Sequence, residues 1–145
     1  MIRDVQIYFH KLDKIAHVFI NEKLRDSELS RGLFFYVLEL SHKDGLSLHD
    51  LSRAIFVDKA YTTRAVARLY ELGYVTRQAD ESDRRLIRIY LTAKGRKAAK
   101  MINDIFVEWR DLISSGVSQA ESAAVLEISR KLYTNAYRYY SEHEE

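Results

Sequence analysis

The sequence predicts an α+β fold that is mainly helical, with four helices, two short strands and then two more helices. Through most of the chain, apolar residues recur every three or four positions, the period of a helix with a buried face. Only after Gly73 does this period shorten to two residues, which indicates strands. The chain has no proline, which suits long uninterrupted helices.

The composition limits the class of protein. A chain of 145 residues can bury its own core, and we expect 1–145 to form a single domain. No apolar run approaches the ~20 residues that span a bilayer, and the N-terminus lacks the hydrophobic block of a signal peptide. We therefore expect a cytoplasmic protein with no membrane partner. Because cysteine is absent, disulfides and thiolate metal sites are excluded.

The first two helices differ in how much of their surface is apolar. Residues 1–25 carry apolar side chains on more than one side, so this helix is expected to pack against two partners. After a polar break, a second helix is predicted to begin at Leu29-Ser30, with Ser30 as its N-cap. Gly45 follows that helix and fits the left-handed residue that closes it.

Two short helices with a tight connection follow. Ser47 and Asp50 have the spacing of a capping box, which opens a helix that turns Leu51 inward. Asp58 then fits the N-cap of the next helix, which Gly73 ends. Its inward stripe is predicted to be Thr62, Ala65, Val66, Leu69 and Leu72. Two helices joined by a turn of a few residues have the geometry of a helix-turn-helix.

A two-stranded ribbon is predicted directly after this pair. The runs 74–78 and 86–91 are rich in β-branched and aromatic residues, and the polar stretch 79–85 between them fits a hairpin tip. A ribbon in this place is a wing, so 29–91 is predicted to form a winged helix-turn-helix lobe.

The remaining chain, 92–143, is predicted to form two long helices. Thr92 can cap the first, which runs to about Ser115 and ends at Gly116. Ser118 and Glu121 form a second capping box that opens the last helix. Together with 1–25, these helices show more apolar surface than a thin monomer could bury, so we expect them to form a dimerisation base.

The wing carries the clearest resemblance to a known family. Asp83-Arg84-Arg85 followed by Leu91-Thr92-Ala93-Lys94-Gly95 resembles the "D-x-R … L-T-x-K-G" run of MarR regulators. The match is close in the middle third of the chain, whereas the outer helices agree in number and order. The resemblance implies a homodimeric transcriptional regulator, most often a repressor, that binds double-stranded DNA at a pseudo-palindromic operator.

Charge and helix geometry indicate which residues touch DNA. The segment from Arg53 to Lys97 contains eleven basic and five acidic residues, so it carries a net charge of +6 and the remainder of the chain −4. A basic segment of this kind is typical of a protein that binds a polyanion. On the second helix of the pair, the candidates off the buried stripe are Lys59, Tyr61, Thr63, Arg64 and Arg68. At the wing they are Asp83, Arg84 and Arg85, with Arg85 expected in a minor groove and Asp83 holding its side chain. Phosphate contacts are expected from Ser47, His49 and Arg53.

A small-molecule effector is a further expectation from the resemblance, since many members bind aromatic acids between the dimer base and the winged lobe. The side chains from the segments that would line this space are Tyr8, His17, Arg31, Tyr36 and Trp109. The effector would be a small aromatic or phenolic compound, although aromatic residues at helical spacing are more often core.

Other classes of function receive less support. No nucleophile elbow, phosphate loop or metalloprotease motif is present, so we expect no enzyme and no cofactor. His42, Asp44 and His49 suggest a metal site, but a clear fourth ligand is missing, so no metal is predicted. The alternative is a dimeric protein-interaction module, an antagonist of another regulator without its own DNA binding. The sequence leaves the operator, the effector, the target genes and the sign of regulation open.

Overall fold

The computed structural model describes residues 2–143 and forms two compact units, Met1–Trp109 and Arg110–Glu145. The elements are α1 (Ile2–Lys23), α2 (Leu33–His42), β1 (Leu46–Ser47), α3 (Leu48–Ala54), α4 (Lys59–Glu71), β2 (Val75–Ala79), β3 (Ile87–Leu91), α5 (Ala93–Ile113) and α6 (Gln119–Glu142). This mainly helical chain with one small antiparallel sheet confirms the predicted fold class. Within the part described, no helix is both long and apolar enough to cross a membrane.

The core of the first unit lies between α2, α4 and the start of α5. Phe34 and Leu40 of α2, Val66 and Leu69 of α4 and Ile102 of α5 are fully buried. The last turn of α1 joins this core, but most of the earlier apolar residues of α1 are exposed. Four residues of the inward stripe predicted for α4 are confirmed, because Thr62, Ala65, Val66 and Leu69 are buried. The fifth, Leu72, follows the helix as its C-cap and is half-buried.

The start of α2 corrects one prediction. The helix begins at Leu33, and Gly32, at φ 89°, stands at its N-cap position without a side-chain cap. Ser30 lies in the preceding turn, where the Phe34 amide donates to the Leu29 carbonyl at 3.0 Å. Glycine adopts this left-handed conformation without steric cost. The N-cap is therefore Gly32 and not Ser30, as the sequence had predicted.

The helix-turn-helix consists of α3 and α4. The Ser47 hydroxyl accepts from the Asp50 amide at 3.0 Å, and the Asp58 carboxylate accepts from the Tyr61 amide at 2.8 Å, so both predicted N-caps are confirmed. Phe56 lies between the helices in the left-handed region, at φ 55°. The two caps fix where each helix begins and therefore which side chains α4 exposes.

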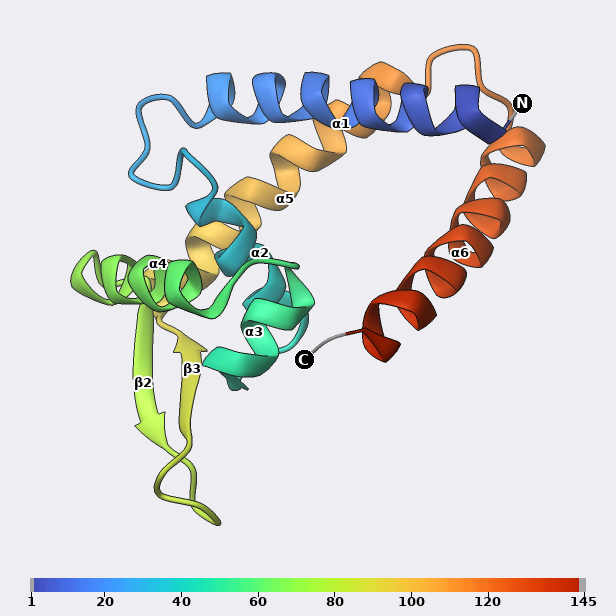
Figure 1. Cartoon of the computed structure of the whole chain (residues 1–145). Helices are drawn as coiled ribbons and strands as arrows, with labels where there is room; N and C mark the ends of the chain where they lie inside the picture. The colour runs from blue at the N-terminus through green and yellow to red at the C-terminus, as the bar shows by residue number, and fades with distance from the viewer. Residues whose placement is uncertain (1, 144–145) are drawn as a thin grey trace. The chain divides into compact units, whose positions relative to one another are not determined.

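The sheet contains one strand that the sequence pattern did not predict. The order is β1-β3-β2, with both pairings antiparallel. The β2–β3 hairpin matches the predicted ribbon and extends away from α2, α3 and α4 (Figure 1). Only two residues form β1, Leu46 opposite Ile89 and Ser47 opposite Arg88. Two residues are too few to show an alternating pattern.

The start of α5 packs closely on the end of α4. The Thr92 hydroxyl accepts from the Gly95 amide at 3.0 Å and donates to the Gly73 carbonyl at 2.7 Å. A Cβ added at Gly95 would lie 2.1 Å from the carbonyl oxygen of Tyr74, so only glycine fits. The Thr-x-x-Gly part of the family run therefore fastens α5 to the base of the wing.

In the second unit, Ser118 and Glu121 form the predicted capping box at the start of α6. The Glu121 amide donates to the Ser118 hydroxyl, and the Glu121 carboxylate accepts from the Ser118 amide at 2.8 Å. The hydrogen bonds that the Ser118 hydroxyl and the Ser118 amide donate to this carboxylate lower the pKa of Glu121. In the single chain α6 has no buried residue, although it carries Val125, Ile128 and Tyr139.

Candidate nucleic-acid interface

The exposed face of α4 carries the side chains predicted to read DNA. Lys59, Tyr61, Thr63, Arg64 and Arg68 are all exposed, whereas the buried residues of α4 are Thr62, Ala65, Val66 and Leu69. The Thr63 hydroxyl donates to the Lys59 carbonyl at 2.8 Å, so this side chain is already hydrogen-bonded within the helix. The structure thus leaves all five side chains exposed, and the two arginines have the longest reach.

The two arginines of α4 have local partners. The Arg64 guanidinium lies 5.8 Å from the centre of the Tyr61 ring, so the tyrosine supports the arginine side chain. Arg68 contacts Glu71 at 3.3 Å, but both side chains are more than half exposed. Exposed pairs of this kind contribute less than about 1 kcal/mol, so a DNA phosphate can compete with Glu71 for Arg68.

The wing tip presents two exposed arginines, Arg84 and Arg85, and neither side chain has an ion-pair partner among residues 2–143. The prediction for Asp83 was wrong in its detail. Its carboxylate accepts from the backbone amide of Arg85 at 3.1 Å rather than from the guanidinium. An aspartate commonly accepts from the amide two residues further on in a turn. Asp83 therefore shapes the turn, and the Arg85 side chain remains available.

The sequence pattern predicted no role for two further residues of the wing, Asp80 and Arg88. One Asp80 oxygen accepts from the amides of Ser82 and Asp83 at 2.9 and 3.0 Å, and from the Ser82 hydroxyl. Its other oxygen accepts from Arg88 Nε. The hydrogen bonds from Ser82, Arg88 and Asp83 lower the pKa of Asp80 well below its ordinary value of 3.8. The sequence signal for this turn was an aspartate two residues before a serine.

The three predicted phosphate contacts occupy different environments. Ser47 is only 3% exposed, and its hydroxyl donates to the Asp50 carboxylate at 2.8 Å. A phosphate contact through this side chain would require the α3 cap to open. His49 lies exposed in the first turn of α3, and Arg53 is half-buried in its last turn. Of the three, His49 is the most accessible.

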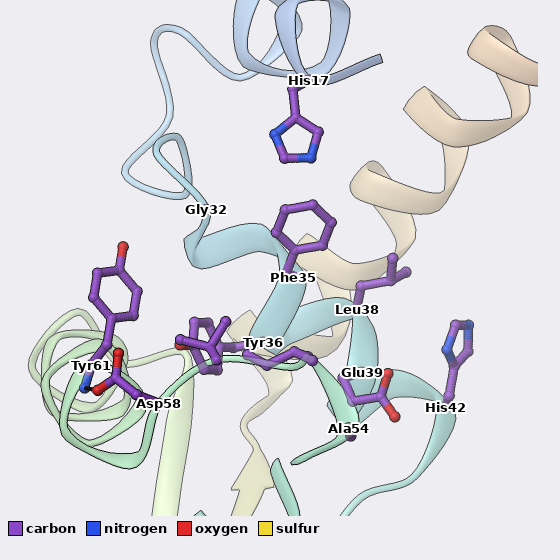
Figure 2. A pocket seen from close by; sticks show the side chains of 12 residues that line it. His17, Gly32, Phe35, Tyr36, Leu38, Glu39, His42, Ala54, Asp58 and Tyr61 are labelled. Atoms are coloured by element: carbon purple, nitrogen blue, oxygen red, sulfur yellow. Dashed lines mark hydrogen bonds between the residues drawn. The ribbon is translucent and has the colours of Figure 1, made fainter. Parts of the chain in front are cut away.

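A cavity of about 600 Å³ lies beside α2, between α1 and the α3–α4 turn. Figure 2 shows His17 of α1 above Phe35 of α2, with Tyr61 of α4 on another wall. The ring centres of His17 and Phe35 lie 5.3 Å apart. Of the five residues predicted for an effector site, His17 and Tyr36 line this cavity.

The other three candidate effector residues lie outside that cavity. Tyr8 is 70% exposed on α1, whereas Trp109 is buried against Phe19, with ring centres 5.3 Å apart. Arg31 lines a separate groove of about 430 Å³ that also includes Arg64. Arg31 lies in the left-handed region, at φ 59°, which a non-glycine residue rarely adopts. Arg31 therefore shares a groove with Arg64 of α4, the candidate DNA-binding helix.

The walls of the cavity are mainly apolar, with a few polar groups. Phe35, Leu38 and Ile55 contribute apolar surface. His17 and His42 contribute imidazoles, and Glu39 and Asp58 contribute carboxylates. The Tyr36 hydroxyl lies 3.4 Å from the Thr62 hydroxyl, and burial raises the pKa of Tyr36. An apolar cavity with a few polar groups is the usual form of a small-molecule site.

The three residues considered as metal ligands lie in three different environments: His42, Asp44 and His49. Asp44 accepts from the Leu91 amide at 2.9 Å and pairs with Arg96 at 3.2 Å. His42 lines the cavity, and His49 lies exposed on α3. In residues 2–143 no three histidine, aspartate or glutamate side chains gather as a metal site would require.

A helix-turn-helix followed directly by a basic hairpin is the fold of a winged DNA-binding protein. The family model for the MarR family matches residues 29–87. A transcriptional regulator of Clostridium symbiosum, BilQ, is 30% identical over 115 residues, which cover 79% of this chain and 80% of that protein. BilQ of Clostridioides difficile is 32% identical over 110 residues, covering 76% and 74%. The chain belongs to the MarR family and is a DNA-binding transcriptional regulator.

Solved structures of other regulators have the same fold. A crystal structure of the regulator SlyA has a TM-score of 0.90 at 22% identity and covers 97% of this chain and 99% of its own. A MarR regulator of Methanosarcina mazei Go1 has a TM-score of 0.86 at 27% identity, covering 94% and 98%. Bordetella bronchiseptica BpsR, whose DNA binding is regulated by 6-hydroxynicotinic acid, has a TM-score of 0.76 at 22% identity, covering 90% and 98%.

Proposed function

We propose that the protein is a homodimeric repressor that binds a pseudo-palindromic operator and is released by a small aromatic acid. The observation that carries the DNA-binding part is the pair of arginines at the wing tip, Arg84 and Arg85. Both are exposed and have no ion-pair partner among the described residues, and they follow a recognition helix that exposes Arg64 and Arg68.

The two kinds of element suit two grooves of DNA. A helix fits the major groove, where Arg64 and Arg68 can address guanine edges or phosphates. An extended tip can place an arginine in the adjacent minor groove, whose negative potential is strongest where A·T pairs narrow it. Arg85 is the residue we place there, because the turn held by Asp83 leaves its guanidinium available.

The dimer is supported by apolar surface that the single chain leaves open. On α1, Val5, Phe9 and Leu12 are each exposed by more than a third, and on α6 Val125 and Ile128 by more than half. Contiguous apolar patches usually mark an interface in a folded protein. A second copy of the chain would cover them, and its two-fold symmetry would match a pseudo-palindromic operator.

The release step is supported by the position of the cavity. Its lining includes Asp58, the N-cap of α4, and Tyr61 in the first turn of that helix. A ligand bound there would touch both α2 and the start of the recognition helix, so its binding can favour one placement of α4 over another. An aromatic acid is the effector class because BpsR responds to one. The cavity, which Glu39 and Asp58 also line, offers aromatic walls for the ring and two imidazoles for the acidic group.

A salt titration of binding to DNA from upstream of the protein's own gene tests the proposal. We expect log affinity to fall steeply with log salt, because cation–phosphate contacts release counterions. Arg85→Ala should weaken operator binding by roughly 1–3 kcal/mol without lowering the melting temperature. Lys100→Ala removes the same charge from the exposed surface of α5 and serves as the matched control.

The outcomes separate this proposal from the alternative. Footprinting should protect two half-sites about one helical turn apart. If the chain dimerises yet binds no DNA at low salt, it is a protein-interaction module and the proposal fails. If it binds DNA but Arg85→Ala and Lys100→Ala behave alike, the wing contact is wrong while DNA binding stands.

A further inference from the structure

Arg88 joins the wing to a segment far away in the sequence. It lies on β3, where its Nε donates to the Asp80 carboxylate at the base of the wing tip. Its Nη1 donates to the carbonyl oxygen of Gly45 at 2.9 Å, across 43 residues of sequence. One planar guanidinium thus binds two acceptors in a fixed relative direction, which a lysine ammonium does not do.

The Asp80 end of this bridge holds the tip itself. Its second oxygen accepts from Ser82 and Asp83, and Asp83 in turn accepts from the amide of Arg85 at 3.1 Å. The Asp80 amide donates to the Leu86 carbonyl at 2.8 Å, which closes the turn. An unbroken series of hydrogen bonds therefore runs from Arg88 to the backbone of Arg85.

The Gly45 end of the bridge is firmly held. The Gly45 amide donates to the Ile89 carbonyl at 2.9 Å. A Cβ at this position would lie 2.8 Å from the Tyr90 ring, so the backbone lies directly against that ring. The neighbouring Asp44 accepts from the Leu91 amide at 2.9 Å, which ties this segment to the end of β3. Gly45 is thus a rigid support for Arg88.

We propose that Arg88 and Asp80 are positioning residues for DNA binding: they hold the wing tip in one direction, so that Arg85 meets the minor groove without being ordered first. In this proposal Arg88 acts through the tip, because its Nε and Nη1 donate within the protein to Asp80 and Gly45. The inference rests on the proposed wing contact. Losing the bridge leaves the Arg85 side chain present but poorly oriented, so binding must then order the tip.

A double-mutant cycle with Arg85→Ala tests this role. Arg88→Ala alone should lower operator affinity about tenfold, whereas in the Arg85→Ala background it should change affinity less than twofold. Arg88→Lys should lower affinity almost as much as Arg88→Ala. A lysine keeps the positive charge but cannot donate to Asp80 and Gly45 in the two directions that the planar guanidinium provides. If Arg88→Lys restores full affinity, or if the two losses add, Arg88 contacts DNA directly and the proposal is overturned.

A measurement without DNA separates this proposal from the wing contact. By NMR, hydrogen exchange at the amides of Ser82, Asp83 and Arg85 should be slow in the wild type and at least tenfold faster in Arg88→Lys. Unchanged exchange would overturn the positioning role, whatever the DNA result. If exchange quickens but Arg85→Ala leaves affinity intact, the wing contact fails and the DNA-positioning role fails with it, leaving only a structural bridge.

Arg96→Ala is the matched control variant. It removes one arginine from the same hydrogen-bond network, through Asp44, but leaves the Asp80–Arg88–Gly45 bridge in place. We expect its operator affinity to stay within twofold of the wild type and its melting temperature to match that of Arg88→Lys. If Arg96→Ala lowers affinity as much as Arg88→Ala, lost charge explains both results and the bridge does not.

Discussion

The Lys94 ammonium donates to the carbonyl oxygen of Leu72 at 2.7 Å, where α4 has just ended. It also lies 4.2 Å from the centre of the Tyr74 ring and 3.4 Å from Glu28. By charge alone, Lys94 belongs to the basic segment that predicts DNA binding. Its contacts give it a different role, since a cation at the C-terminal end of a helix stabilises the free carbonyls there.

The glycine after Lys94 should be intolerant of any side chain. Gly95→Ala would bring a Cβ to 2.1 Å from the Tyr74 carbonyl, a backbone atom that cannot rotate away. We expect a loss of about 1–3 kcal/mol in the free energy of unfolding, as for other overpacked sites. Urea unfolding measures it, with exposed Lys97→Ala expected within about 0.5 kcal/mol of the wild type. Equal stability of both variants would contradict the close approach.

Arg31 should extend the DNA contact beyond the recognition helix. It shares a groove with Arg64, and the acidic residue of that groove, Glu28, is held by Tyr74 and Lys94. We expect Arg31→Ala to weaken binding to any DNA sequence and to reduce the salt slope by about 0.9, the value for one phosphate. Arg25→Ala, another exposed arginine near the end of α1, is the control. An unchanged slope would show that Arg31 meets no phosphate.

An aromatic acid should bind the cavity that His17 and His42 line. With 6-hydroxynicotinic acid or benzoate as the probe, we expect the melting temperature to rise with ligand concentration, because a ligand that binds only the folded state stabilises it. Replacing both histidines by alanine should abolish the shift. His49→Ala, outside the cavity, should retain it. A shift that survives in the double variant would place the ligand elsewhere.

Acid should weaken the turn that Asp80 holds. Its pKa is lowered in the folded protein, first by the Ser82 hydroxyl and then by Arg88, so the ionised carboxylate stabilises the fold at neutral pH. This contribution is complete above the unfolded pKa, near 4, and decreases as pH falls toward the lower folded value. The stability difference between wild type and Asp80→Asn should therefore shrink from pH 7 to pH 3. A constant difference would show that ionisation of Asp80 is irrelevant.

Local chemistry made much of the fold predictable. The N-caps at Ser47, Asp58 and Ser118 each act within three residues, and the buried stripe of α4 follows from one helical period. The same locality explains the wing hairpin, whose strands were predicted to within one residue. Such features depend on neighbours in the sequence, so a single sequence contains them.

The missed features depend on contacts between distant residues. Nothing near Arg88 indicates that it binds the Gly45 carbonyl, and two residues of β1 are too short to show a pattern. The separation of His17 and Tyr36 from Trp109 likewise depends on how α1 and α5 pack. The residue types were visible in the sequence, but their grouping was not.

The central place of β3 in the sheet has a consequence for engineering. Because β3 pairs with β2 on one side and with β1 on the other, the wing is not an independent hairpin. A chimera that imports residues 75–91 from a relative would place a foreign β3 against the β1 strand and the Gly45 carbonyl of this chain. We expect such grafts to transfer DNA preference intact only when residues 44–47 come from the same parent, which makes a discontinuous segment the smallest exchangeable unit.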